Sequence, residues 1–292
     1  VLVATPGRLL DLYRQNAIKF NQLQLLVLDE ADRMLDLGFA DELDQLFSAL
    51  PPKRQTLLFS ATFSAPIRQM ADGMLRDPLM IDISPRNSAI ASVEQWLVPV
   101  DKKRKTELFL QLLAERKWPQ TLVFAKTRKA VELLLEAVQA QGVKADCIHG
   151  DRPQPSRLRA LECFKNNEVS MLIATDVAAR GLDIPELPLV INFDLPINAE
   201  DYVHRIGRSG RAGASGEAIS LVSADEVRQL AAIETLTQKL LERREQIDFA
   251  PEHRVPETRV GGQLIKKPKK PKKPKTYGGK GKTHLGNWFD QS

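Results

Sequence analysis

The stretch that decides the fold is residues 27–32, which read Val-Leu-Asp-Glu-Ala-Asp. A short apolar run that predicts a strand leads here directly into three carboxylates. In a parallel sheet, the carboxyl ends of the strands are where ligands bind. Asp29 is therefore a candidate to hold Mg²⁺ through water, and Glu30 to orient and polarise the water that attacks a γ-phosphate. The alternative is an acidic cluster that caps the following helix, because carboxylates favour helix N-termini.

Similar apolar runs recur along the chain and alternate with segments of helical periodicity. Residues 127–141 and 154–167 carry apolar side chains at helical spacing. This alternation predicts βαβ units and parallel sheets, and so an α/β fold. We expect strands at residues 25–28, 56–59, 121–125, 145–148, 170–174, 189–193 and 218–222.

The chain length of 292 residues favours two domains. Residues 1–84 are too few for a complete multi-strand α/β domain, whereas residues 93–248 suffice for one. Residues 85–92 have few large apolar side chains and no sustained period, so we expect a linker there. The chain opens with Val1, inside an apolar run, and we expect the first domain to be truncated at its start.

Positive charge is concentrated at the end of the chain. Residues 261–292 carry nine lysines and one acid, whereas residues 1–260 have a formal charge of −3. A Lys-Lys-Pro repeat at 266–274 cannot build a core, so residues 249–292 are predicted to be a disordered tail. The basic tail favours a polyanion partner, and nucleic acid over membrane, because prolines rather than apolar anchors separate the lysines.

Two classes of protein are disfavoured by composition. No apolar run approaches the roughly 18 residues of a membrane-spanning helix. The two cysteines, Cys147 and Cys163, lie in apolar stretches, cannot form a disulfide framework and show no metal-ligand spacing. We expect buried thiols in a reducing compartment, and thus a cytoplasmic protein.

Residues 204–211 read His-Arg-Ile-Gly-Arg-Ser-Gly-Arg and form a second signal. The segment is too polar for a core and too rich in glycine for a stable surface helix. Arginines held by a tight backbone suit bidentate contact with phosphate. The alternative, a solvated basic loop, has no need of such ordered glycines.

The two segments resemble motifs II and VI of the DEAD-box RNA helicases, and other segments resemble further motifs of that family in order. They are residues 5–8 (motif Ib), 60–62 (III), 123–127 (IV), 149–151 with Gln154 and Arg157 (IVa), and 174–176 with 180–183 (V). The resemblance spans residues 1–245 and implies tandem RecA-like domains that close over ATP and single-stranded RNA. The core followed by a lysine-proline tail is most similar to the bacterial RhlE-like group.

By motif position, the resemblance implies a role for each matched residue. Asp29 would reach Mg²⁺ through water and Glu30 would be the catalytic base, with Arg208 and Arg211 as arginine fingers from the second domain. Asp183, in the same motif as Gly181, would contact the ATP ribose. Coupling of hydrolysis to domain closure is implied for Asp32, Ser60, Thr62, His204 and Arg180.

Contacts to the RNA backbone are implied for Thr5, Gly7, Arg8, Gly150, Gln154, Arg157 and Thr175. Two alternatives stay open, since Thr5 could cap the helix that begins near Pro6, and Arg157 could be a solvated helix residue. Backbone contacts carry no base identity and so imply sequence-independent binding. Hydroxyl-rich contacts fit RNA, which the 2′-OH distinguishes from DNA.

The sequence departs from the family at its front. The Walker A loop, G-x-x-x-x-G-K-[ST], has no match, nor have the adenine-reading Q motif and motif Ia. Gly281-Lys282-Thr283 copies the end of that loop, but Thr276 stands where its first glycine would be. We therefore expect an incomplete nucleotide site and an inactive fragment.

The predicted function of the complete protein is that of an ATP-dependent RNA helicase with ATP and Mg²⁺ as cofactors. It would unwind short RNA duplexes or remodel RNA–protein complexes, with single-stranded or short duplex RNA as partner and ribosomal or RNA-degradation complexes as candidates. The alternative is a non-catalytic RNA-binding module. A DNA helicase of related architecture is disfavoured by the acidic tetrad at residues 29–32.

Overall fold

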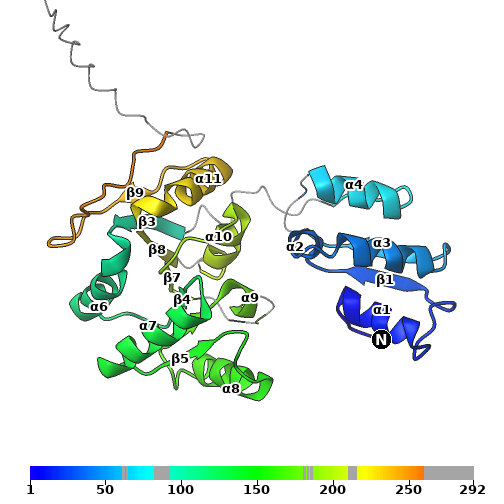
Figure 1. Cartoon of the computed structure of the whole chain (residues 1–292), viewed down its shortest axis with the longest axis horizontal. Helices are drawn as coiled ribbons and strands as arrows, with labels where there is room; N and C mark the ends of the chain where they lie inside the picture. Colours follow the sequence, from blue (N-terminus) through cyan, green and yellow to red (C-terminus); the bar gives the residue numbers. More distant parts are fainter. Residues whose placement is uncertain are drawn as a thin grey trace, which may run out of the picture. The chain divides into compact units, whose positions relative to one another are not determined.

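The computed structural model describes residues 1–60, 63, 65–81, 93–179, 182, 184, 187–209 and 216–259. The chain divides into two compact units, Val1–Ser88 and Ala89–Ser292 (Figure 1). The boundary falls within residues 85–92, where the sequence predicts a linker.

The first unit contains a two-stranded parallel sheet among its described residues. Strand β1 (Leu25–Leu28) pairs with β2 (Gln55–Leu58), in a register that places Leu25 opposite Gln55 and Leu28 opposite Leu58. The helices of this unit are α1 (Pro6–Arg14), α2 (Ala31–Asp36), α3 (Ala40–Ala49) and α4 (Ala65–Met74).

A small apolar core joins α1, the loop that follows it and α3. Its buried members are Leu10, Phe20, Leu46 and Leu50. By contrast, one face of the sheet is open, since Leu25, Val27, Leu57 and Phe59 are between 36% and 54% exposed. Parallel sheets are normally covered on both faces, so this face lacks a covering layer among the described residues.

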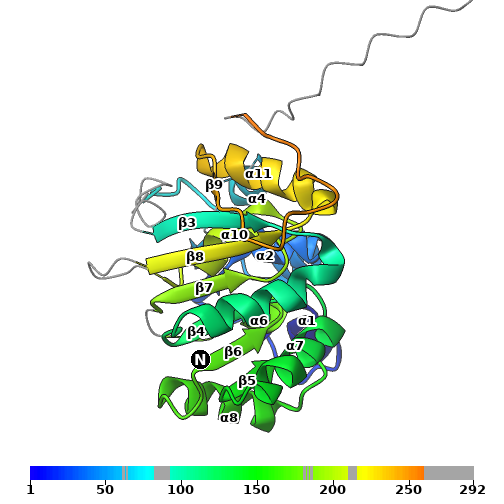
Figure 2. The same cartoon turned by 90° about the vertical axis from the view of Figure 1, so that its left-hand side faces the viewer.

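The second unit is built on one parallel sheet with strand order β5-β6-β4-β7-β8-β3-β9. Figure 2 shows the strands side by side from β3 to β5. Their bounds are β3 Val93–Pro99, β4 Thr121–Phe124, β5 Ala145–Ile148, β6 Met171–Ala174, β7 Leu189–Asn192, β8 Gly216–Val222 and β9 Glu242–Arg243.

Helices cover both faces of this sheet. On one face, α6 and α7 pack against strand residues such as Val123 and Ile173. On the other face, α8 and α9 pack around Leu122 and Leu172, and α10 and α11 around Leu97. The helices are η1 Lys102–Arg104, α6 Lys105–Glu115, α7 Arg128–Ala140, α8 Gln154–Lys165, α9 Asp176–Ala179, α10 Ala199–Ile206, η2 Ala224–Glu226 and α11 Val227–Thr237.

The local sequence explains where α7 begins and which face of the helix is buried. The hydroxyl of Thr127 at the N-cap accepts a hydrogen bond from the amide of Ala130, a contact that satisfies one of the free N–H groups of the first turn. Val131, Leu134 and Val138 recur at helical spacing and are buried. The helix predicted over residues 127–141 therefore forms over Arg128–Ala140.

The predicted α/β fold with parallel sheets is confirmed. Strands β1 and β5 have the predicted bounds, and the other five predicted strands differ by one or two residues at an end. The prediction omitted β3 and β9. In β3, Glu94 and Gln95 interrupt the apolar run, yet the strand pairs along its whole length with β8.

The predicted start of the tail at residue 249 is wrong, because residues 249–258 pack on the second unit. Phe249 and Val255 are 2% and 5% exposed and belong to its apolar core. The guanidinium of Arg243 donates to the carbonyls of Val255 at 2.8 Å and Pro256 at 2.7 Å. Apolar anchors thus order a segment whose prolines favoured disorder. The rest of the predicted tail, residues 260–292, lies outside the described residues.

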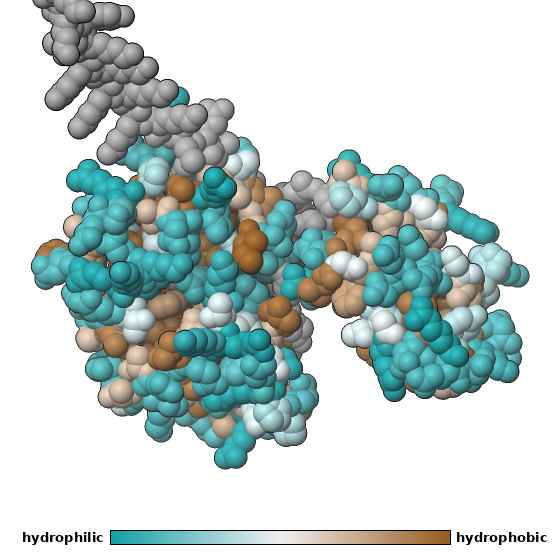
Figure 3. Space-filling model, in the orientation of Figure 1, coloured by the Kyte–Doolittle hydropathy of each residue, from teal (hydrophilic) through white to brown (hydrophobic). Residues whose placement is uncertain are grey.

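Within the part of the chain that the structure describes, no helix is long and apolar enough to cross a membrane. The face seen in Figure 3 is largely hydrophilic, with apolar side chains in separate patches.

Candidate functional site

Several of the predicted site residues follow the carboxyl ends of parallel strands in each unit. In the first unit, residues 29–32 follow β1 and Ser60 follows β2. In the second unit, Gly150 comes two residues after β5, and Thr175 follows β6 directly. Since the carboxyl ends of parallel strands meet at one edge of a sheet, these residues lie at one edge of the sheet in each unit.

The acidic segment after β1 has an unusual backbone at Glu30. Its φ and ψ are 51° and 51°, in the left-handed region that a residue other than glycine rarely adopts. Such strained conformations concentrate at functional sites. The Glu30 amide donates to Oδ1 of Asp29 at 3.0 Å, and both side chains are exposed.

The geometry of α2 bears on the capping alternative. Glu30 occupies the N-cap position, but its side chain makes no capping hydrogen bond. Asp32 lies in the first turn, where its Oδ1 accepts from the amide of Arg33 at 3.0 Å. The carboxylate of Glu30 is thus exposed and plays no part in capping the helix.

The end of β2 is tied to the acidic segment. The amide of Ala31 donates to the carbonyl of Phe59 at 3.0 Å, and the amide of Asp32 donates to Oγ of Ser60 at 3.3 Å. Ser60 thus contacts the acidic segment, through a backbone amide. Thr62, its predicted companion in coupling, lies outside the described residues.

The three RNA-binding residues predicted in the first unit surround the start of α1. Thr5 is the N-cap residue by position, but its side chain forms no capping bond. A Cβ on Gly7 would meet no atom within 4 Å, so the backbone there is open to a ligand. Arg8 pairs with Asp11 at 2.5 Å, but both side chains are exposed, and such surface pairs are weak.

The RNA-binding residues predicted in the second unit differ in exposure. Gly150 is exposed with open space around it, whereas Thr175 is 9% exposed. Gln154 opens α8 and accepts from Nη1 of Arg157 at 3.0 Å. Arg157 is half-buried, and its Nε has no partner among the described residues, so it is not simply a solvated helix residue.

The arginine-rich segment begins in α10 and turns at Gly207. A Cβ at Gly207 would lie 3.0 Å from the carbonyl oxygen of Val203, so glycine allows this close approach. Arg208 donates from Nη1 to the carbonyl of Leu182 at 3.2 Å, and its own carbonyl accepts from the amide of Leu187 at 2.9 Å. His204 is half-buried in α10. Four other predicted residues of the second unit lie outside the described residues, namely Arg180, Gly181, Asp183 and Arg211.

Sequence reasoning assigned no role to Arg205, which is 2% exposed at the centre of this edge. Its guanidinium donates to both carboxylate oxygens of Asp176, at 2.6 and 2.7 Å. It also donates to Oδ1 of Asn192 at 2.9 Å and to the carbonyl of Asp194 at 2.7 Å. The arginine-rich pattern was the available signal, but burial separates Arg205 from arginines that can reach a ligand.

The fold also brings together Glu132, Cys147 and His149, whose ligand atoms lie within 4.8 Å of one another. Nε2 of His149 lies 2.5 Å from Oε1 of Glu132. Burial raises the pKa of the Cys147 thiol to about 12, so it stays protonated near neutral pH. The cluster is explained by a buried histidine that has a carboxylate partner, with the thiol packed as a small apolar group.

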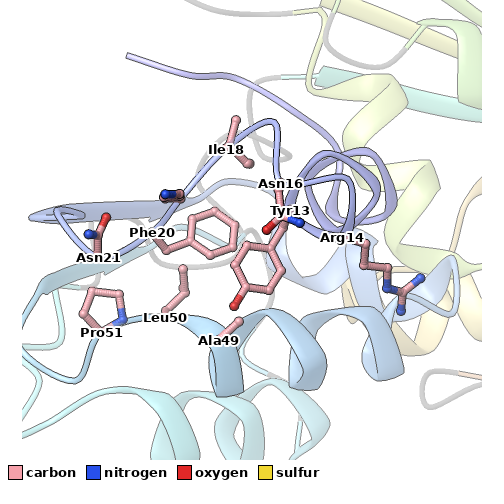
Figure 4. A pocket seen from close by; sticks show the side chains of 10 residues that line it. Tyr13, Arg14, Asn16, Ile18, Phe20, Asn21, Ala49, Leu50 and Pro51 are labelled. Carbon is pink, nitrogen blue, oxygen red and sulfur yellow. The ribbon is translucent and has the colours of Figure 1, made fainter.

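A pocket of about 730 Å³ lies at the C-terminal end of α1, near Tyr13 and Arg14 (Figure 4). Tyr13 stacks on Phe20 there with ring centroids 4.7 Å apart, and Leu50 and Pro51 of the α3 end line the floor. None of the predicted site residues lines this pocket.

Family models match both units. Residues 1–70 match the DEAD/DEAH box helicase model, and residues 104–213 match the helicase conserved C-terminal domain. The chain is 40% identical over 243 residues to the DEAD-box ATP-dependent RNA helicase CshA of Geobacillus kaustophilus, covering 83% of this chain and 52% of the relative. It is 42% identical over 238 residues to the ATP-dependent RNA helicase RhlB of Pseudomonas putida, covering 81% and 60%. The chain thus spans about half the length of these relatives.

Solved structures of helicases are also similar to this chain. S. cerevisiae Dbp5 bound to RNA and ADP BeF3 is 31% identical with a TM-score of 0.74, covering 84% of this chain and 66% of that one. E. coli DEAD-box protein SrmB bound to regulator of ribonuclease activity A is 34% identical with a TM-score of 0.53, covering 56% and 98%. The acidic tetrad, the ordered series of motifs, the two family models and these relatives agree, and the chain belongs to the DEAD-box RNA helicase family.

Proposed function

We propose that the complete protein is an ATP-dependent RNA helicase that uses ATP with Mg²⁺ to open short RNA duplexes or to remodel RNA–protein complexes. The observation that carries this proposal is the end of β1. Asp29 and Glu30 present exposed carboxylates there, and Glu30 keeps a left-handed backbone that serves no capping role. Carboxylate oxygens are suitable ligands for Mg²⁺ or its bound waters.

In this reaction each group of the chain has a definite task. Glu30 would accept a proton from the attacking water, and Asp29 would hold Mg²⁺ through water, an ion that would supply positive charge to neutralise the phosphates. Arg208 and Arg211 stabilise negative charge that develops on the transferred phosphoryl group. Asp183 and Gly181 bind the nucleotide, and Asp32, Ser60, Thr62, His204 and Arg180 couple hydrolysis to RNA binding.

RNA is the proposed partner, bound through its backbone. Support comes from Gly7 and Gly150, where an added Cβ would meet no described atom within 4 Å, so no neighbouring group crowds the backbone at these positions. Thr5, Arg8, Gln154, Arg157 and Thr175 complete the proposed contacts. A related helicase has been solved with RNA bound. Membership of the RhlE-like group, a cytoplasmic location, and ribosomal or RNA-degradation complexes as partners stay predictions.

We also infer that further chain covers the open face of the first sheet in the complete protein. Val27 and Leu57 are 49% and 36% exposed on parallel strands, which are normally buried on both faces. The proposed covering chain also brings the phosphate-binding loop that has no match in these 292 residues.

An ATPase assay tests the proposal. The 292-residue chain is expected to show no turnover, and a protein extended upstream through a Gly-Lys-Thr loop is expected to show turnover stimulated by RNA and not by DNA. Stimulation by DNA alone would contradict the RNA assignment. RNA binding without any turnover of the extended protein would support a binding module instead.

A further inference from the structure

Lys105, the first residue of α6, is buried in the second unit with an exposure of 2%. Its ammonium donates to the carbonyl of Phe193 at 2.8 Å, to Oδ1 of Asp194 at 3.1 Å and to Oε2 of Glu226 at 2.7 Å. An ammonium has three donors, and all three are used. The side chain is thus fixed at the carboxyl edge of the sheet, just after β7.

Asp194 links Lys105 by hydrogen bonds to two other segments, at Lys126 and Arg205. Its Oδ2 accepts from the amide of Lys126, in the loop after β4, at 3.0 Å. Its carbonyl accepts from Nη1 of Arg205 at 2.7 Å, and Arg205 in turn holds both oxygens of Asp176. A continuous chain of hydrogen bonds therefore runs from Lys105 through Asp194 and Arg205 to Asp176, which we call the Lys105 network.

Glu226 anchors the other side of Lys105. Its Oε1 accepts from the amide of Leu195 at 2.9 Å, and its Oε2 accepts from the amide of Ser223 at 3.0 Å. These two amides follow β7 and β8. The Lys105 ammonium thus joins acceptors that belong to the ends of neighbouring strands.

Stability alone is a weak reason for such an arrangement. Burying charges costs solvation free energy, and well-packed apolar side chains often replace buried ion pairs without loss of stability. A network of this kind does fix the positions of the segments that it joins. Those segments are the loop at Lys126, the strand end at Thr175 and Asp176, and the helix that leads to Arg208.

We propose that Lys105 is a positioning residue, which holds the strand end at Thr175 and the segment of Arg208 in their active geometry through Asp194 and Arg205. This rests on the proposed function, since Thr175 and Arg208 are assigned there to RNA and ATP. Lys105 lies outside every helicase motif recognised in the sequence. Its buried side chain touches neither ligand and acts through residues that do.

The chain offers a matched control three residues earlier. Lys102 forms an ion pair with Asp225 at 3.0 Å, but their side chains are 72% and 54% exposed. Replacing Lys102 by Met removes the same charge from the same region, and no hydrogen bond of the Lys105 network involves the Lys102 side chain. Lys102→Met therefore reports the effect of losing an exposed charge without losing a buried, hydrogen-bonded ammonium.

The test uses the extended protein and compares wild type, Lys105→Met, Lys105→Arg and Lys102→Met. RNA affinity and the RNA concentration for half-maximal ATPase activity are measured at a temperature where tryptophan fluorescence shows each protein folded. For Lys105→Met, RNA affinity is expected to fall about tenfold, and the RNA concentration for half-maximal ATPase activity is expected to rise about tenfold. This is in the range of effects that mutations along coupling networks show. Lys105→Arg, which keeps charge and donors, recovers part of the loss, and Lys102→Met stays within about twofold of wild type.

Each outcome separates this inference from the proposed function. If wild type binds no RNA and hydrolyses no ATP, the proposed function fails. If wild type is active and folded Lys105→Met matches it within twofold, Lys105 has no positioning role. If Lys105→Met does not fold, the same two measurements are made on Lys105→Arg and Asp194→Asn. The proposal is overturned if RNA affinity and the RNA concentration for half-maximal ATPase activity are unchanged in both variants.

Discussion

The amide of Asp32 donates a hydrogen bond of 3.3 Å to the hydroxyl oxygen of Ser60, 28 residues further along the chain. This contact ties the end of β2 to the acidic segment that follows β1. Ser60 therefore contacts the backbone of the acidic segment although it belongs to a different strand end.

Ser60→Ala combined with Thr62→Ala is expected to reduce unwinding more than ATP hydrolysis in the complete protein. The Ser60 hydroxyl contacts Asp32, while Glu30 and Asp29 keep their positions. Steady-state ATPase and duplex-unwinding assays measure the two activities. Ser48→Ala, which removes a hydroxyl that donates to the carbonyl of Asp44 at an exposed position of α3, serves as control. Equal loss of both activities would point to misfolding or to direct catalysis by these hydroxyls.

Glu30→Gln is expected to abolish ATP turnover in the complete protein while RNA and ATP still bind. The amide keeps the size of the side chain and cannot accept the proton of the attacking water.

Arg208→Ala is expected to lower the turnover rate by up to about 10³- to 10⁵-fold, the range for arginine fingers. Single-turnover ATP hydrolysis and RNA binding in the presence of ATP are measured for Glu30→Gln and for Arg208→Ala. An Arg208→Ala enzyme with an unchanged rate would show that its assignment is wrong.

Arg205→Met is expected to destabilise the second unit by about 3–5 kcal/mol, because removing one partner leaves the other charge uncompensated in a buried pair. The control is Arg128→Met, which breaks an ion pair with Asp151 whose side chains are 61% and 62% exposed. That change is expected to cost about 0–1 kcal/mol. Trp96 and Trp118 lie among the described residues of the second unit, so urea unfolding followed by tryptophan fluorescence reports on that unit. Equal effects of the two changes would contradict the buried role of Arg205.

Stability of the second unit is expected to fall as pH rises from about 9 to about 12. Burial raises the pKa of Cys147 to about 12 in the folded chain from an ordinary value of 9.0. The stabilisation is complete below the unfolded pKa, and it is lost as pH rises toward the folded pKa, because the unfolded thiol ionises first. Burial also raises the pKa of Tyr202, which adds to the same trend.

Cys147→Val is expected to flatten this pH dependence, measured by urea unfolding at several pH values between 8 and about 11. Cys163→Val is the matched control, since Cys163 is only partly buried. In the native wild type, a thiol reagent at pH 8 should label Cys163 well before Cys147. Rapid labelling of Cys147 would show that its thiol is not buried in the native protein.

Deletion of residues 261–292 is expected to weaken RNA binding at low salt and to flatten its salt dependence. Each neutralised phosphate contributes roughly −0.7 to the slope of log K against log salt on single strands. If a third of the nine lysines engage, the slope changes by about 2. In the complete protein with and without this segment, RNA affinity across a salt series measures the slope, and ATP turnover at saturating RNA is the control. An unchanged slope would mean that the segment is a spacer or a protein-docking arm.

The sequence alone determined the fold class, and it placed the acidic segment directly after a strand. Strands such as β5 are short apolar runs, and α7 has a capping threonine followed by apolar residues at helical spacing, so local patterns suffice to predict them. The acidic tetrad after β1 was recognisable because an apolar strand that runs into three carboxylates is a local feature. Its assignment to a family needed only the order of the motifs along the chain.

Tertiary structure alone decided which charged residues are buried and what they join. Lys105 reaches Glu226 across 121 residues, and no spacing in the sequence distinguishes it from exposed Lys102. Likewise, Phe249 and Val255 order a segment rich in proline by packing into the core of the second unit. The reason is the same in both cases, because burial depends on segments that are distant in sequence and meet only after the sheet has formed. The left-handed backbone of Glu30 also became evident only in the folded chain.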